Sequence, residues 1–126
     1  MKILDTTIRD GSYAIDFKFS CKDVQNLVEK AEKIGIEYIE IGHGQGLNAS
    51  SPEHGIALQS DEEYMKAARK VAGMAKLGFF CIPGIARMED LELAKKNGMD
   101  FIRIGVACSD YKQAIPYVQN GCYEGL

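Results

Sequence analysis

The chain has 126 residues, 46% of them apolar, which is enough for one hydrophobic core but not for a large multidomain architecture. A net charge of -3, without any lysine- or arginine-rich block, excludes the broad basic surface that nucleic-acid binding needs. The sequence has neither an apolar run long enough to cross a bilayer nor the apolar stretch of a secretory signal after its first residues. We therefore expect a cytoplasmic protein with no nucleic-acid or membrane partner.

The first half of the chain alternates strand and helix patterns. Residues 2–5 predict a short strand, and Ser20 is a candidate N-cap for a helix that Gly35 ends. The apolar stripe expected on this helix consists of Val24, Leu27, Val28, Ala31 and Ile34. A second strand follows over residues 36–42, then a loop rich in Gly, Asn and Ser, and then a helix from about Ser60 with acids in its first turn.

The second half repeats this alternation. Residues 77–84 predict a third strand and residues 88–98 a third helix. A fourth strand is expected over residues 100–105, before a weaker helix over 109–121 that Pro116 interrupts. A fifth strand is expected to begin within the final residues, 120–126. The four cysteines lie far apart and form no C-x-x-C pair, so we expect buried, reduced thiols.

Four strand-helix units indicate a parallel sheet, which leaves an open doubly wound sheet or part of a barrel. The length favours an open sheet, because a complete barrel needs roughly 250 residues. The pattern within the strands favours the barrel. Ile39 and Ile41 share one face while Glu40 lies on the other, and Arg103 likewise lies opposite Ile102 and Ile104. A central strand of a doubly wound sheet would be apolar on both faces. We therefore expect an α/β fold of the TIM-barrel type with about four units, an incomplete barrel.

Charged residues occur where barrel enzymes carry their chemistry. Arg9 and Asp10 are expected at the C-terminal end of the first strand, and Glu40 and Arg103 at comparable points of later strands. Two acids and two bases therefore converge at one end of the sheet. The same pattern is also typical of an ion-pair network that only stabilises the mouth of a barrel, and the residues alone do not separate the two interpretations.

Three stretches, in this order, carry a family resemblance: "LDTTIRDGSYA" (4–14), "IEIGHGQGLNASS" (39–51) and "IPGI" (82–85). Together they resemble the metal-dependent pyruvate aldolases that cleave 4-hydroxy-2-oxovalerate, within a superfamily of aldolases, lyases and acyl-CoA condensing synthases with an Arg-Asp-Gly signature. The resemblance implies that residues 1–126 form the N-terminal half of a TIM-barrel catalytic domain. It also implies a small 2-oxo acid substrate, retro-aldol cleavage to pyruvate and an aldehyde, and frequent pairing with an aldehyde dehydrogenase.

The resemblance also assigns roles to single residues. Asp10 matches a ligand of a divalent metal, Mn or Mg, and Arg9 matches the arginine that stabilises the pyruvate enolate. Glu40 matches a supporting glutamate, and Arg103 is a further candidate for substrate binding. A base would take the proton of the C4 hydroxyl before the C3–C4 bond breaks.

The sequence departs from the family at two points. Tyr13 occupies the position of the family's catalytic histidine, and a phenol with a pKa near 10 is a poor base at neutral pH. Tyr13 either acts as an activated base, positions substrate or marks another reaction. His43 is a possible substitute base or a substrate-binding residue, whereas His54 is expected at the surface.

The second departure is the lack of the family's His-x-His metal ligands. We therefore expect the remaining ligands outside this chain, and the isolated chain to be inactive. A half-barrel is also expected to form a homo-oligomer or to associate with a complementing half. Two alternatives to the aldolase stay open: a Claisen-type acyl-CoA condensing synthase, and a non-catalytic half-barrel that binds a metabolite or assembles with a partner.

Overall fold

The computed structural model describes all 126 residues and confirms four consecutive strand-helix units. Along the chain the elements are β1 (Leu4–Asp5), α1 (Thr7–Gly11), the 3-10 turn η1 (Ser12–Ile15), α2 (Cys21–Lys33), β2 (Tyr38–Ile41), α3 (Asp61–Val71), β3 (Lys76–Cys81), α4 (Met88–Lys96), β4 (Phe101–Ile104), the 3-10 turn η2 (Cys108–Gln113) and α5 (Ala114–Glu124). None of the helices is long and apolar enough to span a membrane.

The ends of the two longest helices before β3 follow from local chemistry. The hydroxyl groups of Ser20 and Ser60 accept hydrogen bonds from the third backbone N–H of α2 and α3, and an acidic side chain in each helix bonds back to the serine N–H. After α2 the chain turns through Gly35 at a φ of 88°, a conformation that favours glycine. Both predicted helix starts and this helix end are confirmed.

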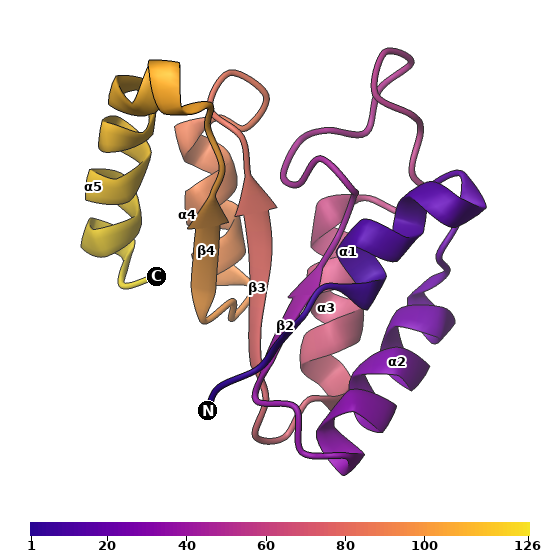
Figure 1. Cartoon of the computed structure of the whole chain (residues 1–126). Helices are drawn as coiled ribbons and strands as arrows, with labels where there is room; N and C mark the ends of the chain where they lie inside the picture. The colour runs from indigo at the N-terminus through magenta and orange to yellow at the C-terminus, as the bar shows by residue number, and fades with distance from the viewer.

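The sheet is parallel and its strands follow the chain in the order β1-β2-β3-β4. A doubly wound sheet reverses this order at a switch point, and no reversal occurs here. In Figure 1 the arrowheads of β2, β3 and β4 lie at the same end of the sheet, where the long loop after β2 also emerges. The consecutive order confirms the barrel-type architecture, with β1 and β4 as open edges.

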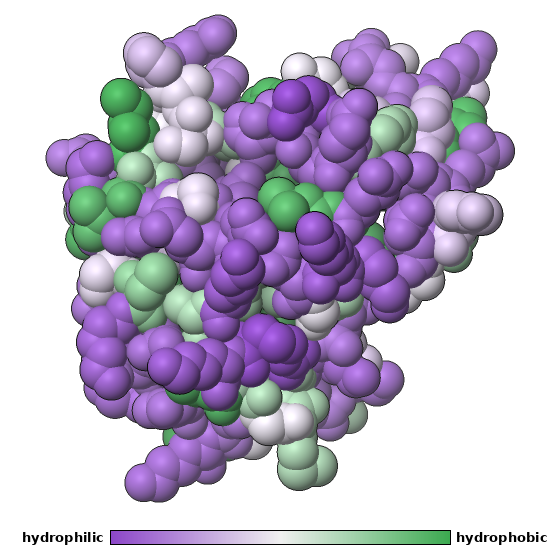
Figure 2. Space-filling view, turned by 180° about the vertical axis from the view of Figure 1, so that it is seen from behind, coloured by the Kyte–Doolittle hydropathy of each residue, from purple (hydrophilic) through white to green (hydrophobic).

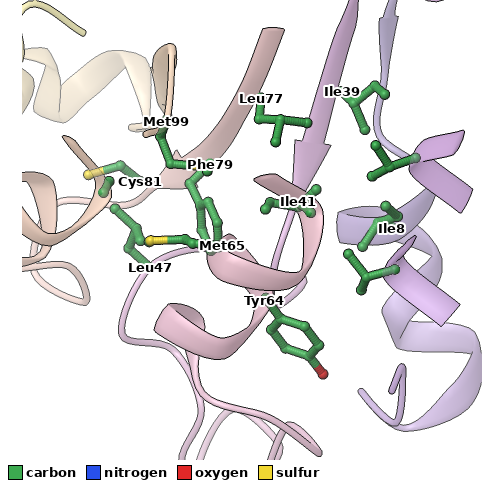
Figure 3. Packing of buried hydrophobic residues seen from close by; sticks show 14 of the residues in the cluster. Ile8, Ile39, Ile41, Leu47, Tyr64, Met65, Leu77, Phe79, Cys81 and Met99 are labelled. Atoms are coloured by element: carbon green, nitrogen blue, oxygen red, sulfur yellow. The ribbon is translucent and has the colours of Figure 1, made fainter. Parts of the chain in front are cut away.

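One face of the sheet carries the hydrophobic core. Ile39, Ile41, Leu77 and Phe79 have no exposed surface and pack in a single cluster with residues of α2, α3 and α4. Figure 3 shows Met65 and Leu47 beside Phe79, with Ile8 of α1 close to Ile41. Seen from behind, the surface is mostly hydrophilic, with separate small hydrophobic areas, as amphipathic helices produce (Figure 2). The helices α2, α3 and α4 therefore cover this face of the sheet, which we call the outward face.

The other face, which we call the inward face, presents the alternate residues of the same strands. Tyr38 and Phe101 make an edge-on contact there, with ring centroids 5.8 Å apart. Glu40, Phe80 and Arg103 lie farther along β2, β3 and β4. The predicted alternation of apolar and polar residues is therefore confirmed in β2 and β4.

Several predicted details are wrong. The first strand comprises only Leu4–Asp5 and begins two residues later than predicted. It ends at Asp5 as expected, where the Asp5 carboxylate accepts hydrogen bonds from the N–H and hydroxyl groups of Thr7. Ile34 does not join the apolar stripe of α2: it is 79% exposed, because the helix ends at Lys33. Two of the four free cysteines, Cys108 and Cys122, are exposed rather than buried.

The C-terminal region differs most from expectation. Pro116 does not interrupt a helix, because it is the third residue of α5 and proline is tolerated in a first turn. The helix then continues to Glu124 and ends at Gly125. No fifth strand begins within residues 120–126.

Candidate functional site

Arg9, Asp10, Glu40 and Arg103 form a polar cluster at the inward face. Its centre is the carboxylate of Glu40, which is completely buried. Its Oε2 accepts a hydrogen bond from Arg9 Nε at 2.8 Å. Arg103 donates to both oxygens, from Nε to Oε1 at 2.9 Å and from Nη2 to Oε2 at 2.8 Å. A buried carboxylate is stable only when it is paired, and Glu40 has two cationic partners. The structure thus brings together three of the residues that the sequence identified.

Arg9 and Asp10 lie on α1 and not at the end of β1, which corrects the sequence-based placement. The helical turn directs Ile8 into the core and leaves Arg9 beside Glu40. Arg9 Nη1 also donates to Asp10 Oδ1 at 2.9 Å and to the carbonyl oxygen of Gly44 at 3.2 Å. The arginine therefore links α1, β2 and the loop that follows β2.

One terminal guanidinium nitrogen of each arginine, Nη2 of Arg9 and Nη1 of Arg103, has no hydrogen-bond partner within the chain. The hydrogen bonds from Arg103 to Glu40 raise the pKa of the Arg103 guanidinium above its ordinary value. The cluster can therefore donate hydrogen bonds to the oxygens of a carboxylate or an enolate.

Asp10 is the one carboxylate of the cluster with a free oxygen, and its side chain is 60% exposed. Both oxygens of Glu40 accept hydrogen bonds from arginine. No group of three or more His, Cys, Asp or Glu side chains in the chain could hold a metal ion. The residues present therefore do not form a divalent-metal site by themselves, and Asp10 as a metal ligand stays a prediction.

The loop of residues 42–59 lies over the ends of the strands. Leu47 donates its N–H to the carbonyl oxygen of Phe80 at 2.9 Å, and a Cβ on Gly46 would lie 2.1 Å from the same oxygen. A side chain at Gly44 would likewise overlap the ring of Tyr13. The glycines of the "GHGQGL" stretch thus allow close contact of the loop with β3 and η1.

His43 is buried within this loop, and both of its ring nitrogens have backbone partners. Nδ1 accepts the N–H of Gln45 at 3.1 Å, which leaves Nε2 to donate to the carbonyl oxygen of Gly55 at 3.0 Å. Burial lowers the pKa of His43, which favours the neutral ring. A role as catalytic base would require one of these two hydrogen bonds to break. His54 is only partly exposed, whereas the sequence indicated a surface position.

Tyr13 is half-exposed on η1, next to the loop. Its ring contacts Phe17 edge-on at 5.2 Å, and Phe17 in turn stacks on His43 at 4.0 Å. The phenol oxygen makes no hydrogen bond to the arginines or to Asp10. Tyr13 therefore lies at the margin of the cluster, and nothing in its contacts activates the hydroxyl group.

Two aromatic residues of the site were missed by sequence reasoning. Phe80 lies beside both arginines, with its ring centroid 5.0 Å from the guanidinium carbon of Arg9 and 4.6 Å from that of Arg103. Phe17 holds His43 and has a φ of 60°, which is rare for a bulky residue. Phe80 could have been found from its alternation with Phe79 in β3, whereas no sequence signal indicates the conformation of Phe17.

Known proteins resemble this chain along almost its whole length. The oxaloacetate decarboxylase of Mycobacterium tuberculosis is 42% identical over 124 residues, which are 98% of this chain and 36% of that protein. The 4-hydroxy-2-oxovalerate aldolase of Carboxydothermus hydrogenoformans is 36% identical over 87% of this chain and 33% of its own length. The chain thus spans about a third of the curated relatives that it matches.

A solved structure supports the fold. The N-terminal domain of a candidate aldolase from Bacteroides vulgatus matches all of this chain and 42% of that chain, with a TM-score of 0.80 and 22% sequence identity. The family model described as HMGL-like matches residues 1–118, which include every residue of the polar cluster. The resemblance seen in the sequence motifs is thereby confirmed, and the chain belongs to the HMGL-like family.

Proposed function

We propose that this chain forms the N-terminal part of the active site of a carbon-carbon lyase that releases the enolate of pyruvate from a 2-oxo acid. The observation that carries the proposal is the pair of arginines fixed by buried Glu40, each with one free amino group. Such groups stabilise negative charge that develops on an oxygen during bond cleavage. Both relatives named above support this class of reaction.

In the proposed retro-aldol reaction, a base takes the proton of the C4 hydroxyl of a 4-hydroxy-2-oxo acid. The C3–C4 bond then breaks, its electrons pass into the enolate of pyruvate, and the aldehyde leaves. Arg9 holds the enolate through its planar guanidinium group, and Arg103 binds the substrate carboxylate. Asp10 is proposed as a ligand of Mn or Mg, with the remaining ligands and the rest of the barrel supplied from outside this chain.

A second candidate reaction is decarboxylation of oxaloacetate. Here too the C3–C4 bond breaks and leaves the pyruvate enolate, but carbon dioxide departs and no hydroxyl proton must be removed first. The site favours this alternative in one respect. Tyr13 has no contact that activates its hydroxyl group, and both nitrogens of His43 are engaged with the backbone.

A chimaera tests the proposal and separates the two reactions. Residues of this chain replace the matched region of the Mycobacterium tuberculosis relative, so that the rest of the barrel is present. Release of pyruvate is then measured with 4-hydroxy-2-oxovalerate and with oxaloacetate. The proposal expects turnover of at least one of the two substrates. A folded, metal-loaded chimaera that turns over neither would contradict it.

Variants at Tyr13 distinguish a role as catalytic base from a role in positioning the substrate. If Tyr13 is the base of an aldolase, Tyr13→Phe reduces aldol cleavage by about a hundred- to ten-thousand-fold. If Tyr13 positions substrate, the same variant mainly raises KM, which is the outcome we expect. Tyr13→His restores the family's residue and should increase aldol cleavage. Tyr123→Phe, at an exposed tyrosine on α5, is the matched control and should change neither rate.

A further inference from the structure

Phe80 is placed to contact both arginines of the cluster at once. It pairs in register with Arg103 on the neighbouring strand, so the two side chains project from the same face of the sheet. Arg9 reaches the same ring from α1. The face of an aromatic ring carries partial negative charge and attracts a guanidinium group. One ring therefore contacts two cations that come from distant parts of the chain.

The ring of Phe80 is itself held in place. A Cβ on Gly105 would lie 2.2 Å from the Phe80 Cζ atom, so the tip of the ring rests directly against the backbone after β4. The carbonyl oxygen of Phe80 accepts the N–H of Leu47, which fixes the backbone of this residue to the loop. Because the ring has little freedom to move, the two guanidinium groups against it are restricted as well.

Because the charges of the cluster balance, binding of an anion depends on how the arginine N–H groups are oriented. Arg9 and Arg103 are matched by two carboxylates, Asp10 and Glu40, so the four groups have no excess positive charge. An anion would therefore be held by the direction of the free N–H groups and not by net attraction. An arginine that could rotate away from its place would lose this contact.

We propose that Phe80 is a positioning residue: its ring holds Arg9 and Arg103 around Glu40 so that Arg9 Nη2 and Arg103 Nη1 remain directed at a planar carboxylate ligand. Glu40 accepts hydrogen bonds from one edge of each guanidinium group, and the Phe80 ring restricts the plane of both groups. This inference rests on the proposed function only for the class of ligand, a planar carboxylate that resembles the pyruvate enolate.

NMR spectroscopy of the arginine side chains tests the arrangement in the 126-residue chain. In the wild type, the Nε–H protons of Arg9 and Arg103 should show ring-current shifts, which Phe80→Leu should remove. Phe101→Leu is the matched control, because Phe101 also lies on the inward face but contacts Tyr38 and not the arginines. It should leave both Nε–H signals in place.

Titration with oxalate, followed by the same two signals, tests the consequence for binding. We expect Phe80→Leu to raise the Kd for oxalate about three- to tenfold, the range typical of losing cation–π contacts. Phe101→Leu should change this Kd by less than about twofold. The proposal is overturned if the wild type does not bind oxalate, if its arginine signals show no ring-current shift, or if both variants change the Kd equally.

These measurements need no turnover, so they also distinguish the two proposals. A chimaera that is inactive although the Phe80 effects are present would contradict the lyase function and leave the positioning role intact. Conversely, an active chimaera in which Phe80→Leu changes neither KM nor kcat would contradict the positioning role of Phe80 and support the lyase function.

Discussion

The two faces of the four-stranded sheet are built from alternate residues of the same strands, yet they have opposite properties. On the outward face, Ile39 and Phe79 are completely buried under helices. On the inward face, their neighbours Glu40 and Phe80 belong to a network of charges and an aromatic ring. The outward face contributes most of the stability of the fold, whereas the inward face contributes less and can carry chemistry.

The two faces also differ in how they are covered. The outward face is covered by its own helices, but β1 and β4 have open edges and the inward face is not enclosed. Open edges of a sheet pair readily with further strands. We therefore expect the isolated chain to associate.

The largest expected effect is on the association state of the isolated chain, and therefore on its mass in solution. Sedimentation at micromolar concentration should give a dimer or larger species, or a complex when a complementing barrel half is added. The chain should also bind a dye that reports exposed apolar surface. A stable monomer that binds no dye would contradict the half-barrel interpretation.

The next expected effect is on the free energy of unfolding, to which the two faces contribute differently. Phe79→Ala on the outward face should lower the free energy of unfolding by about 3–5 kcal/mol, because it leaves a cavity in the core. Phe80→Ala on the inward face should cost less, about 1 kcal/mol, since Phe80 is only partly buried and its ring contacts two arginines and Gly105 rather than the hydrophobic core. Urea unfolding measures both values, and equal losses would refute the division of the two faces.

Glu40 is the buried charge on which the inward face depends. Glu40→Gln leaves Arg9 and Arg103 without their shared anion and should lower the free energy of unfolding by about 2 kcal/mol. Partial exposure of Arg103 keeps the loss below that of a fully buried pair. Glu37→Gln, at an exposed site just before β2, is the control and should change stability by less than about 0.5 kcal/mol. A similar result for both variants would show that the ion pairs do not stabilise the fold.

The smallest effect tests a carboxyl group outside the inward face. Burial raises the pKa of Asp61, the first residue of α3, to about 6. The folded state thus binds this proton more tightly than the unfolded chain, and its contribution to stability is present below pH 4 and lost as the pH rises through 6. The free energy of unfolding of Asp61→Asn, relative to that of the wild type, should therefore increase as the pH rises from 4 to 7. A difference between the two that does not vary with pH would contradict this assignment.

Much of the fold could be predicted from the sequence because its signals are local. The serines that cap α2 and α3 and the alternation in β2 each need only a few neighbouring residues. The placement of Arg9 and Asp10 at the end of β1 was wrong, because the chain enters the helix α1 directly after Asp5, whose carboxylate bonds to Thr7. Pro116 was misread for a related reason, since its effect depends on where the helix begins.

The candidate site could be predicted only in part. The charged residues Arg9, Glu40 and Arg103 stand out in the sequence because they interrupt apolar patterns, and the structure brings them into contact. Phe80 and the buried state of His43 did not stand out, because an aromatic residue in a strand and a histidine in a glycine loop have many possible surroundings. Their positions depend on contacts between distant segments, which a local pattern does not contain.

The proposed role of the inward cluster is to stabilise the enolate of pyruvate, whichever group leaves. Exchange of the methyl protons of pyruvate for deuterium, followed by NMR in the chimaera with its divalent metal, measures this step without any leaving group. We predict exchange in the chimaera, a loss of about a hundred- to a thousandfold in Arg9→Lys, and no exchange in Asp10→Asn. If a folded chimaera does not exchange these protons, or exchanges them equally fast with Arg9→Lys, the inward cluster does not stabilise the enolate.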